Sequence, residues 1–361
     1  MPVGEKTAAI ILAAGKGTRM ESSVPKPLHL LCGKPLTSFV VSALVDINVT
    51  EIVTVVGYKA FEVSEKLHEE SAGQASLQFV EQVTQNGTGH ATLVGLGGLE
   101  AIEKGNLDEN VLVLPGDAPL LRPETLKRLL EVHNNNMAAA TILTALVDDP
   151  TGYGRIIRDA KGRVIRIVED KDALPSQLEV REVNTSVYCF RRTLLPDVLE
   201  KIVANNSQGE FYLTDVIELL QEAGYPVLAV SADDPVEAVG VNDQIQLAVC
   251  EKEMQERIKR YWSSQGVEIL DWQTCQIDAN VEIAEGVIFR ENCSVKGNSV
   301  FGAEAKIGPD VQIFDSSIGD RCRVWQSIIT SSAIGDDCRI GPYVTLDASS
   351  VPDSGTVTGP L

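Results

Sequence analysis

A six-residue repeat dominates the last quarter of this 361-residue chain. Bulky apolar residues recur at every sixth position from Ile277 to Ile313, and the period resumes after slips as far as Leu346. Two positions before most of them stands a small or slender residue such as Ala305. A period of six with these two inner positions predicts a parallel β-helix, because each stacked coil buries the face of its neighbour. The repeat constrains the fold of the chain more strongly than any other feature.

The chain before the repeat has a different pattern, in which short apolar runs alternate with helical periodicity. The strand-like runs lie at 8–11, 51–56, 76–80, 110–114 and 138–146, and the helical patterns at 36–47 and 59–70. This alternation predicts an α/β fold with a doubly wound, mostly parallel sheet. In such sheets ligands bind beyond the carboxyl ends of the strands.

The length and the change of pattern indicate two domains joined by a helix. A chain of 361 residues exceeds the usual size of one domain, and 44% apolar residues are enough for sizeable cores. Residues 244–262 have a long, charge-rich helical pattern that ends near Gly266. We therefore predict an α/β domain at 1–241, a connecting helix at 242–266 and a β-helix domain at 267–361.

Charge and cysteine content narrow the class of partners. The 51 acidic residues outnumber the 31 basic ones, which gives a formal net charge of −20. Such a surface repels nucleic acid and anionic membranes, so neither is expected as a partner. The seven cysteines form no CxxC pair, and four of them occupy small inner positions of the repeat, where we expect packing. No signal-like leader and no membrane-spanning apolar run is present, so we expect a soluble, cytoplasmic protein.

A glycine-rich loop follows the first strand-like run. Residues 12–20 read Leu-Ala-Ala-Gly-Lys-Gly-Thr-Arg-Met. Gly15 and Gly17 can adopt positive φ and let main-chain N–H groups approach an anion, while Lys16 and Arg19 add positive charge. The order fits neither the P-loop nor the G-x-G-x-x-G loop. We predict a phosphate-binding loop of another kind; the alternative is a strand-to-helix turn without a ligand.

A stiff basic element comes next. Lys26 lies between Pro25 and Pro27, which restrict the backbone on both sides, so we expect it to contact a ligand. Residues 12–20, together with Ser23-x-Pro25-Lys26-Pro27-Leu28 and Gly33-Lys34-Pro35-Leu36, resemble the signature of the sugar-1-phosphate nucleotidyltransferases. The similarity is greatest to the N-acetylglucosamine-1-phosphate uridylyltransferases of that family.

The resemblance carries expectations about fold, site and partners. It implies a Rossmann-like nucleotidyltransferase domain and a left-handed β-helix with three hexads per coil, hence about four coils here. It implies catalytic roles for Arg19 and Lys26, and substrate binding by Leu12, Ala13, Ala14 and Gly15. The implied substrates are UTP and a sugar 1-phosphate, the implied cofactor is Mg²⁺, and a homotrimer through the β-helix is expected.

A second glycine-containing loop begins at Gln82 and reads Gln-x-x-Gln-Asn-Gly-Thr-Gly-His-Ala. Gln82 offers a donor and an acceptor, as the edge of a pyrimidine requires. Taken alone, Gly87 and Thr88 could be a turn and a helix cap. The resemblance instead implies that Gln82, Gly87 and Thr88 contact uracil. We interpret His90 as a packing or capping residue, because nucleotidyl transfer needs no histidine.

The run 110–117 is an apolar strand that ends in Pro115-Gly116-Asp117. A carboxylate at that end of the sheet can hold a divalent cation, and Mg²⁺ prefers oxygen ligands. A helix N-cap or a turn is the alternative. The resemblance implies that Pro115 and Gly116 bind substrate, that Asp117 is a metal ligand, and that Asn242, at the end of a later short strand, is the second one.

Between 151 and 188, strands alternate with loops that carry small or hydrogen-bonding side chains. A sugar with hydroxyls and an acetamide needs such a neutral polar surface with one orienting acid. The resemblance implies that Gly154, Glu169 and Asn184 contact the amino sugar. Ser186 departs from the family, which usually has glycine there.

These observations favour uridylyl transfer from UTP to N-acetylglucosamine 1-phosphate, which supplies precursors of cell-envelope polysaccharides. The alternatives are another sugar 1-phosphate, such as glucose or galactosamine 1-phosphate, or a non-catalytic regulatory subunit. Acetyl transfer by the β-helix is not expected, because all four histidines precede the repeat and the chain ends at Leu361, short of the family's full repeat array.

Overall fold

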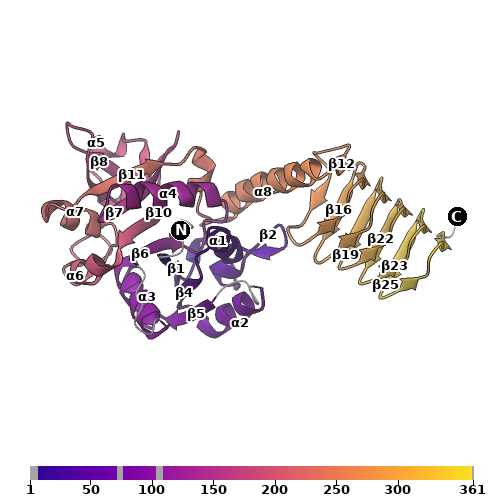
Figure 1. The fold of residues 1–361 in the computed structure, drawn as a ribbon, viewed down its shortest axis with the longest axis horizontal. Coiled ribbons are helices and arrows are strands. Elements are labelled where there is room, and N and C mark those ends of the chain that lie inside the picture. Colours follow the sequence, from indigo (N-terminus) through magenta and orange to yellow (C-terminus); the bar gives the residue numbers. More distant parts are fainter. Residues whose placement is uncertain (1–6, 71–75, 103–108, 360–361) are drawn as a thin grey trace. The chain divides into compact units, whose positions relative to one another are not determined.

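The computed structural model of the chain describes residues 7–70, 76–102 and 109–359 (Figure 1). They divide into two compact units. Unit 1 contains the described residues up to His29 and those from Pro35 to Leu247, and unit 2 contains Leu30–Lys34 and the residues from Ala248 onward. The division after Leu247 falls within the predicted connecting helix. The inclusion of Leu30–Lys34 in unit 2 is a feature that the sequence pattern does not predict.

Unit 1 is built on a nine-stranded sheet whose central path has the order β11-β7-β10-β6-β1-β4-β5. Strands β1, β4, β5 and β6 are parallel, and β10 is antiparallel to β6 and β7. The β8–β9 hairpin is attached to β10. The bounds are β1 (Thr7–Ala13), β4 (Glu51–Val56), β5 (Ser76–Glu81), β6 (Asn110–Pro115), β7 (Ala140–Leu146), β8 (Arg155–Arg158), β9 (Val164–Val168), β10 (Glu182–Arg191) and β11 (Val227–Ser231).

Helices cover both faces of this sheet, and alternate side chains of each strand supply two separate cores. In β1, Ile10 packs into one core and its neighbour Ile11 into the other, as the two-residue period of a strand requires. The first core includes residues of α3, α6 and α7, and the second those of α1 and α4. The helices are α1 (Leu36–Val45), α2 (Ala60–Glu70), α3 (Thr88–Ile102), α4 (Pro123–Asn135), α5 (Pro175–Leu178), α6 (Leu195–Leu199) and α7 (Asp215–Glu222).

The strand order determines where a ligand can enter. From β1 the chain proceeds to β4 and β5 on one side and then returns to β6 on the other side of β1. The loops after β1 and β6 therefore diverge at one edge of the sheet, and such a reversal opens a crevice at the carboxyl ends of the strands. The doubly wound, mostly parallel sheet predicted from the sequence is confirmed.

Unit 2 is a left-handed parallel β-helix, as the repeat and the resemblance predict. After β12 the strands follow one another through three sheets with the orders β12-β15-β18-β21-β24-β27, β13-β16-β19-β22-β25 and β14-β17-β20-β23-β26. This makes five coils of three strands, one more than the four expected, because the interrupted period reveals neither β22, between the slips, nor the two strands after residue 346. The first and last of these strands are β13 (Gln276–Ile277) and β27 (Thr356–Val357).

The remaining strands of unit 2 are short. They are β12 (Glu268–Ile269), β14 (Glu282–Ile283), β15 (Ile288–Phe289), β16 (Cys293–Lys296), β17 (Val300–Phe301), β18 (Lys306–Ile307), β19 (Val311–Phe314), β20 (Ser317–Ile318), β21 (Arg323–Val324), β22 (Ser327–Thr330), β23 (Ala333–Ile334), β24 (Arg339–Ile340), β25 (Val344–Asp347) and β26 (Ser350–Val351). The bulky repeat positions are buried, apart from the half-buried Leu346, and the four cysteines of the repeat are buried as predicted.

A short hairpin from early in the chain completes unit 2. It joins β2 (Leu30–Leu31) to β3 (Lys34–Pro35), and Cys32 lies at its turn. The Cys32 N–H donates to Glu251 Oε2 at 2.9 Å, on α8 (Gln244–Ser264), and the Cys32 carbonyl accepts from Ala279 N at 2.8 Å. Cys32 is buried, and burial raises the pKa of its thiol. Within the described residues, no helix combines the length and apolarity needed to cross a membrane.

Candidate active site

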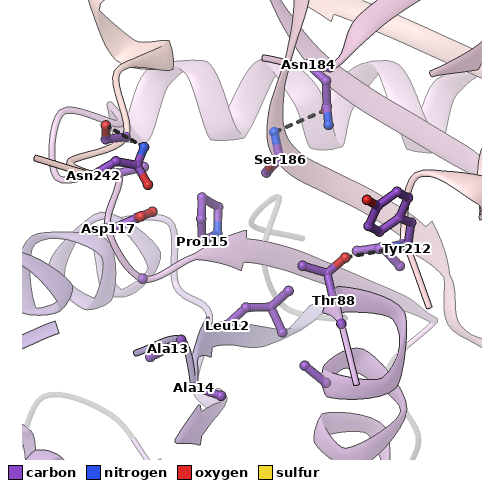
Figure 2. A pocket seen from close by; sticks show the side chains of 18 of the residues that line it. Leu12, Ala13, Ala14, Thr88, Pro115, Asp117, Asn184, Ser186, Tyr212 and Asn242 are labelled. Atoms are coloured by element: carbon purple, nitrogen blue, oxygen red, sulfur yellow. Dashed lines mark hydrogen bonds between the residues drawn. The ribbon is translucent and has the colours of Figure 1, made fainter. Parts of the chain in front are cut away.

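A cavity of about 680 Å³ lies at the carboxyl edge of the sheet in unit 1. The residues to which the resemblance assigned a catalytic, substrate-binding or metal-binding role all line this one cavity: Leu12, Ala13, Ala14, Gly15, Arg19, Lys26, Gln82, Gly87, Thr88, Pro115, Gly116, Asp117, Gly154, Glu169, Asn184 and Asn242. Figure 2 shows Asp117 and Asn242 side by side at one end, with Thr88 and Tyr212 across the cavity from them. The fold thus brings together segments that are up to 230 positions apart in the sequence; the roles of the individual residues stay predictions.

The two glycines of the glycine-rich loop differ in conformation. Gly17 has a φ of +62°, and a Cβ on it would lie 2.7 Å from the Cβ of Lys26. Glycine is required at this position because the backbone is in the left-handed region and because Lys26 packs directly against it. Gly15 differs from the expectation: it does not have positive φ, and a Cβ there would meet no atom within 4 Å. Its conformational freedom is therefore not used in this structure.

Lys26 lies at the centre of a charged cluster at one end of the cavity. Its Nζ donates to Asp117 Oδ2 and, at 2.7 Å, to Asn242 Oδ1. Arg19 donates to the same Asn242 Oδ1 at 2.8 Å. The side chains of Lys26 and Asp117 are mostly shielded from solvent, so their attraction is stronger than that of an exposed pair. Two cations and two oxygen-bearing side chains therefore meet at one point.

The backbone holds these oxygens in place. Gly116 N donates to Leu12 O at 2.9 Å, and Val241 N donates to Asp117 O at 2.8 Å, so the loop after β6 is tied to β1 and to the Asn242 segment. The Asn242 Nδ2 donates to Gly240 O at 3.2 Å. Because a carbonyl only accepts, this bond fixes the amide so that Oδ1 faces Lys26 and Arg19.

The loop that begins at Gln82 is clamped to the segment before α7. Gly87 has a φ of +102°, and a Cβ on it would lie 2.6 Å from Phe211 O. Gly89 N donates to that same carbonyl at 2.8 Å, and Thr88 Oγ1 accepts from Leu213 N at 3.0 Å. Thr88 thus anchors a neighbouring loop, a role that its position as a possible cap did not predict.

The opposite end of the cavity is polar, and the carboxyl group of Glu169 lies there. Glu169 follows β9, and its Oε1 accepts from Thr214 Oγ1 at 3.1 Å. Burial, augmented by neighbouring carboxylates, raises the pKa of Glu169. Gly154 lies beside it, and a Cβ on Gly154 would approach Glu169 Oε2 to 3.5 Å. A sugar-sized ligand would meet a carboxyl group whose burial disfavours the charged form.

Asn184 lies at an irregularity of β10. The register of β10 against β7 shifts between Asn184 and Val187, and Ser186 in this bulge has a φ of +61°. Asn184 Oδ1 accepts from Ser186 N at 3.1 Å (Figure 2). Its Nδ2 donates to Tyr188 Oη at 2.7 Å. The bulge turns Asn184 and Ser186 toward the cavity, which both residues line.

Comparison with known proteins agrees with this geometry. A family model described as nucleotidyl transferase matches residues 8–289. The chain belongs to the nucleotidyl transferase family. The resemblance inferred from residues 12–36 is thereby confirmed, and the chain is a sugar-phosphate nucleotidyltransferase.

Curated relatives of this nucleotidyl transferase carry the name bifunctional protein GlmU. The one from Enterococcus faecalis is 42% identical over 345 residues, which are 95% of this chain and 72% of that protein. The one from Carboxydothermus hydrogenoformans is 40% identical over 337 residues, covering 93% of this chain and 73% of the relative. The one from Acaryochloris marina is 42% identical over 339 residues, with 94% and 72% covered.

Two side-chain oxygens of this nucleotidyl transferase converge where they could act as ligands of a divalent cation. Asp117 Oδ2 and Asn242 Oδ1 both accept from the Lys26 ammonium, so both face one position suited to a cation. Mg²⁺ is commonly bound by one or two protein oxygens, with substrate phosphates and water completing its shell. Among the described residues no cluster of three or more His, Cys, Asp or Glu side chains could hold a metal. The donor set fits a cation shared with substrate phosphate.

The structure adds cavity residues of the nucleotidyl transferase to which the sequence analysis gave no role. Gln85 Nε2 donates to Ala14 O at 2.8 Å and so ties the glycine-rich loop to the Gln82 loop. Tyr212 and Thr214 line the cavity, and Thr214 holds Glu169. Both lie in the segment 205–215, which resembles the family's N-x-x-G-E-x-Y-x-T-D turn, so that resemblance could have identified them.

Proposed function

We propose that this chain transfers a uridylyl group from UTP to N-acetylglucosamine 1-phosphate in a magnesium-dependent reaction. The products are UDP-N-acetylglucosamine, an activated amino sugar for cell-envelope polysaccharides, and pyrophosphate. The observation that carries the proposal is the convergence of Arg19, Lys26, Asp117 and Asn242 at one end of the cavity. The polar wall at the other end, which includes Gly154, Glu169 and Asn184, supports a sugar as the second substrate.

The chemistry proposed is one in-line displacement. A phosphate oxygen of the sugar phosphate attacks the α-phosphorus of UTP, a new O–P bond forms, and the bond to the pyrophosphate oxygen breaks. Pyrophosphate leaves with the electron pair of that bond, so no covalent enzyme intermediate is needed. Positioning and charge stabilisation carry such a reaction, and both are properties of the charged cluster.

The residues of that cluster have complementary tasks in the proposal. Arg19 and Lys26 bind the triphosphate and stabilise the charge that develops on the pyrophosphate. Asp117 and Asn242 would hold the magnesium ion, which supplies further neutralisation of phosphate charge when it is bound. Lys26 must then move from these two oxygens to a phosphate, a change that its flexible side chain permits.

The sugar is proposed to lie against Gly154, Glu169 and Asn184. Thr214 occupies one oxygen of the Glu169 carboxyl, and the other faces the space that Gly154 leaves open. A sugar hydroxyl fits there as a hydrogen-bond partner of the Glu169 carboxyl. Ser186 lines the cavity at a position where the family usually has glycine. Because of this difference, another sugar 1-phosphate is the second candidate for the substrate.

Pyrophosphate release measured with a panel of nucleoside triphosphates and sugar 1-phosphates tests the proposal. We expect turnover with UTP, N-acetylglucosamine 1-phosphate and Mg²⁺, and none after chelation of the metal. The Lys26→Met variant is expected to lower kcat by about 10²-fold to 10³-fold. The exposed Lys161, which is not a cavity residue, provides the matched control Lys161→Met, for which kcat should not change. Equal kcat in Lys26→Met and wild type would contradict the role of Lys26. A preference for another sugar 1-phosphate would show that N-acetylglucosamine 1-phosphate is not the substrate.

We further propose a homotrimer assembled through the β-helix. Phe314 and Ile328 lie on adjacent strands of one sheet, and each exposes 45% of its surface. Apolar side chains that are grouped on one face favour burial against another copy. Light scattering should give three times the chain mass of 38.9 kDa. A Phe314→Glu, Ile328→Glu double variant should dissociate, unlike Val300→Glu on a different sheet; a monomeric wild type would refute the trimer.

A cytoplasmic location is part of the proposal. All seven cysteines are buried and free, including the stacked ones inside the β-helix. Thiols that are kept unpaired suit a reducing compartment. Fractionation of cells that produce the protein, with activity assayed in each fraction, tests this location; activity in an oxidising compartment would contradict it.

A further inference from the structure

The side chain of Gln82 is locked by two hydrogen bonds made by the same nitrogen. Gln82 follows β5, lines the cavity and is 4% exposed. Its Nε2 donates to Gly87 O at 3.1 Å and lies 2.9 Å from Nδ1 of His90. Sequence analysis interpreted His90 as a packing or capping residue, and the structure places its ring nitrogen on a cavity-lining amide.

The two bonds determine which end of the Gln82 amide is available to a ligand. A carbonyl only accepts, so the atom that faces Gly87 O must be the amide nitrogen and cannot be Oε1. Nδ1 of His90 faces the same nitrogen and must therefore be the acceptor, with no hydrogen of its own. Both hydrogens of Nε2 are then in use, and among the described residues no hydrogen bond ends on Oε1. The amide offers the cavity an acceptor and no donor.

The elements around His90 fix the start of the helix that carries it. His90 is in the first turn of α3, where Gly89 N donates to Phe211 O at 2.8 Å and Thr88 Oγ1 accepts from Leu213 N at 3.0 Å. Gly87 O additionally accepts from Ala91 N at 3.1 Å. The helix start is thus tied on both sides, which fixes the backbone that carries His90 next to Gln82.

We infer that His90 is a positioning residue which makes Gln82 select a nucleobase with a ring N–H over one with a bare ring nitrogen. This inference rests on the proposed function, in which Gln82 reads the edge of uracil. Uracil carries a hydrogen on N3 that Oε1 can accept, whereas cytosine in the same place presents a lone pair that Oε1 repels. Without His90 the amide loses one of the two bonds that prevent it from flipping.

The experiment compares kcat/KM for UTP and for CTP in the full-length chain and in two variants. His90→Leu removes the acceptor at similar size, and His90→Asn retains an acceptor near the Nδ1 position. We expect His90→Leu to lower kcat/KM for UTP about fivefold to tenfold, through KM more than kcat, and to reduce the UTP-to-CTP ratio by a similar factor. His90→Asn should restore the ratio to within about threefold of the wild type.

The ratio separates positioning from folding, because a partly unfolded preparation loses both activities equally. In a Gln82→Leu background, His90→Leu should leave the ratio unchanged, since His90 acts through Gln82. An unchanged ratio in His90→Leu, or an equally low ratio in His90→Asn, would overturn the inference while UTP turnover by the wild type upholds the proposed function. A wild type that does not use UTP would overturn both.

Discussion

Asp215 is a carboxylate that the fold holds under unfavourable conditions next to the sugar end of the cavity. It is the first residue of α7 and follows Thr214, which binds Glu169. Burial, together with the charges of Glu218 and Asp172, raises the pKa of Asp215 from 3.8 to about 6. The charge of Asp215 in turn helps to raise the pKa of Glu169. Replacing Asp215 by asparagine should therefore stabilise unit 1 at neutral pH.

The size and sign of this effect follow from the pKa. The pKa of Asp215 is higher in the folded state than in the unfolded state, so protonation of this carboxyl group favours folding. That contribution to the free energy of unfolding is full below pH 3.8 and is lost as the pH rises through 6. Two pKa units correspond to at most about 3 kcal/mol. The side chain is only partly buried, and a carboxylate at a helix N-terminus gains about 0.5 kcal/mol, so we expect a net penalty of about 2 kcal/mol. Asp215→Asn should raise the free energy of unfolding by that amount at pH 8, and by about half of it at pH 5.

Urea unfolding with two probes isolates this effect. All three tryptophans, Trp262, Trp272 and Trp325, belong to unit 2, whereas helices α1 to α7 belong to unit 1. Circular dichroism at the helix band should report the gain, and tryptophan fluorescence should report no change. Asp197→Asn, an exposed acid in the first turn of α6, is the control. No gain at pH 8, or an equal gain at pH 5 and pH 8, would refute the reasoning.

Three further changes test other parts of the structure. Gly17→Ala should destabilise unit 1 by about 1–2 kcal/mol in the same urea assay, because of its positive φ and the 2.7 Å approach to Lys26, whereas Gly15→Ala should change it by less than about 0.5 kcal/mol. In the absence of nucleotide, Lys26→Met should increase the affinity for Mn²⁺ about tenfold, because Asp117 and Asn242 lose the ammonium group that competes with the metal ion. Electron paramagnetic resonance of the free ion measures this affinity. An unchanged affinity would contradict the idea that Lys26 and the metal ion occupy the same position. Burial lowers the pKa of His133 from 6.5 to about 4, so the free energy of unfolding falls as the pH decreases through that range. Between pH 7.5 and pH 5, urea unfolding should show that His133→Asn loses about 2 kcal/mol less of this free energy than the wild type. Equal losses in the two proteins would refute this prediction.

Much of the cavity could be anticipated from local sequence, because the ends of apolar strands are visible in it. Asp117 lies two residues after the end of one apolar strand, and the glycine-rich loop lies at the end of another, so the sequence alone places both at one sheet edge. The helix α1 and the strand β4 begin at the predicted residues, since their apolar periods are undisturbed. The later positions 154, 169 and 184 depended on resemblance, because short polar loops carry no period that indicates which side chains face a ligand.

The amino-acid sequence by itself determined the two architectures, because the repeat of six and the alternation of strands and helices are statements about which residues must be buried. Only the tertiary structure decided the pairings between distant segments. The Lys26 contact with Asn242, the Thr214 bond to Glu169 and the orientation of the Gln82 amide by His90 depend on directions of side chains across loops. Burial has a period that can be read along the chain, whereas a hydrogen bond depends on where two atoms lie after the chain has folded.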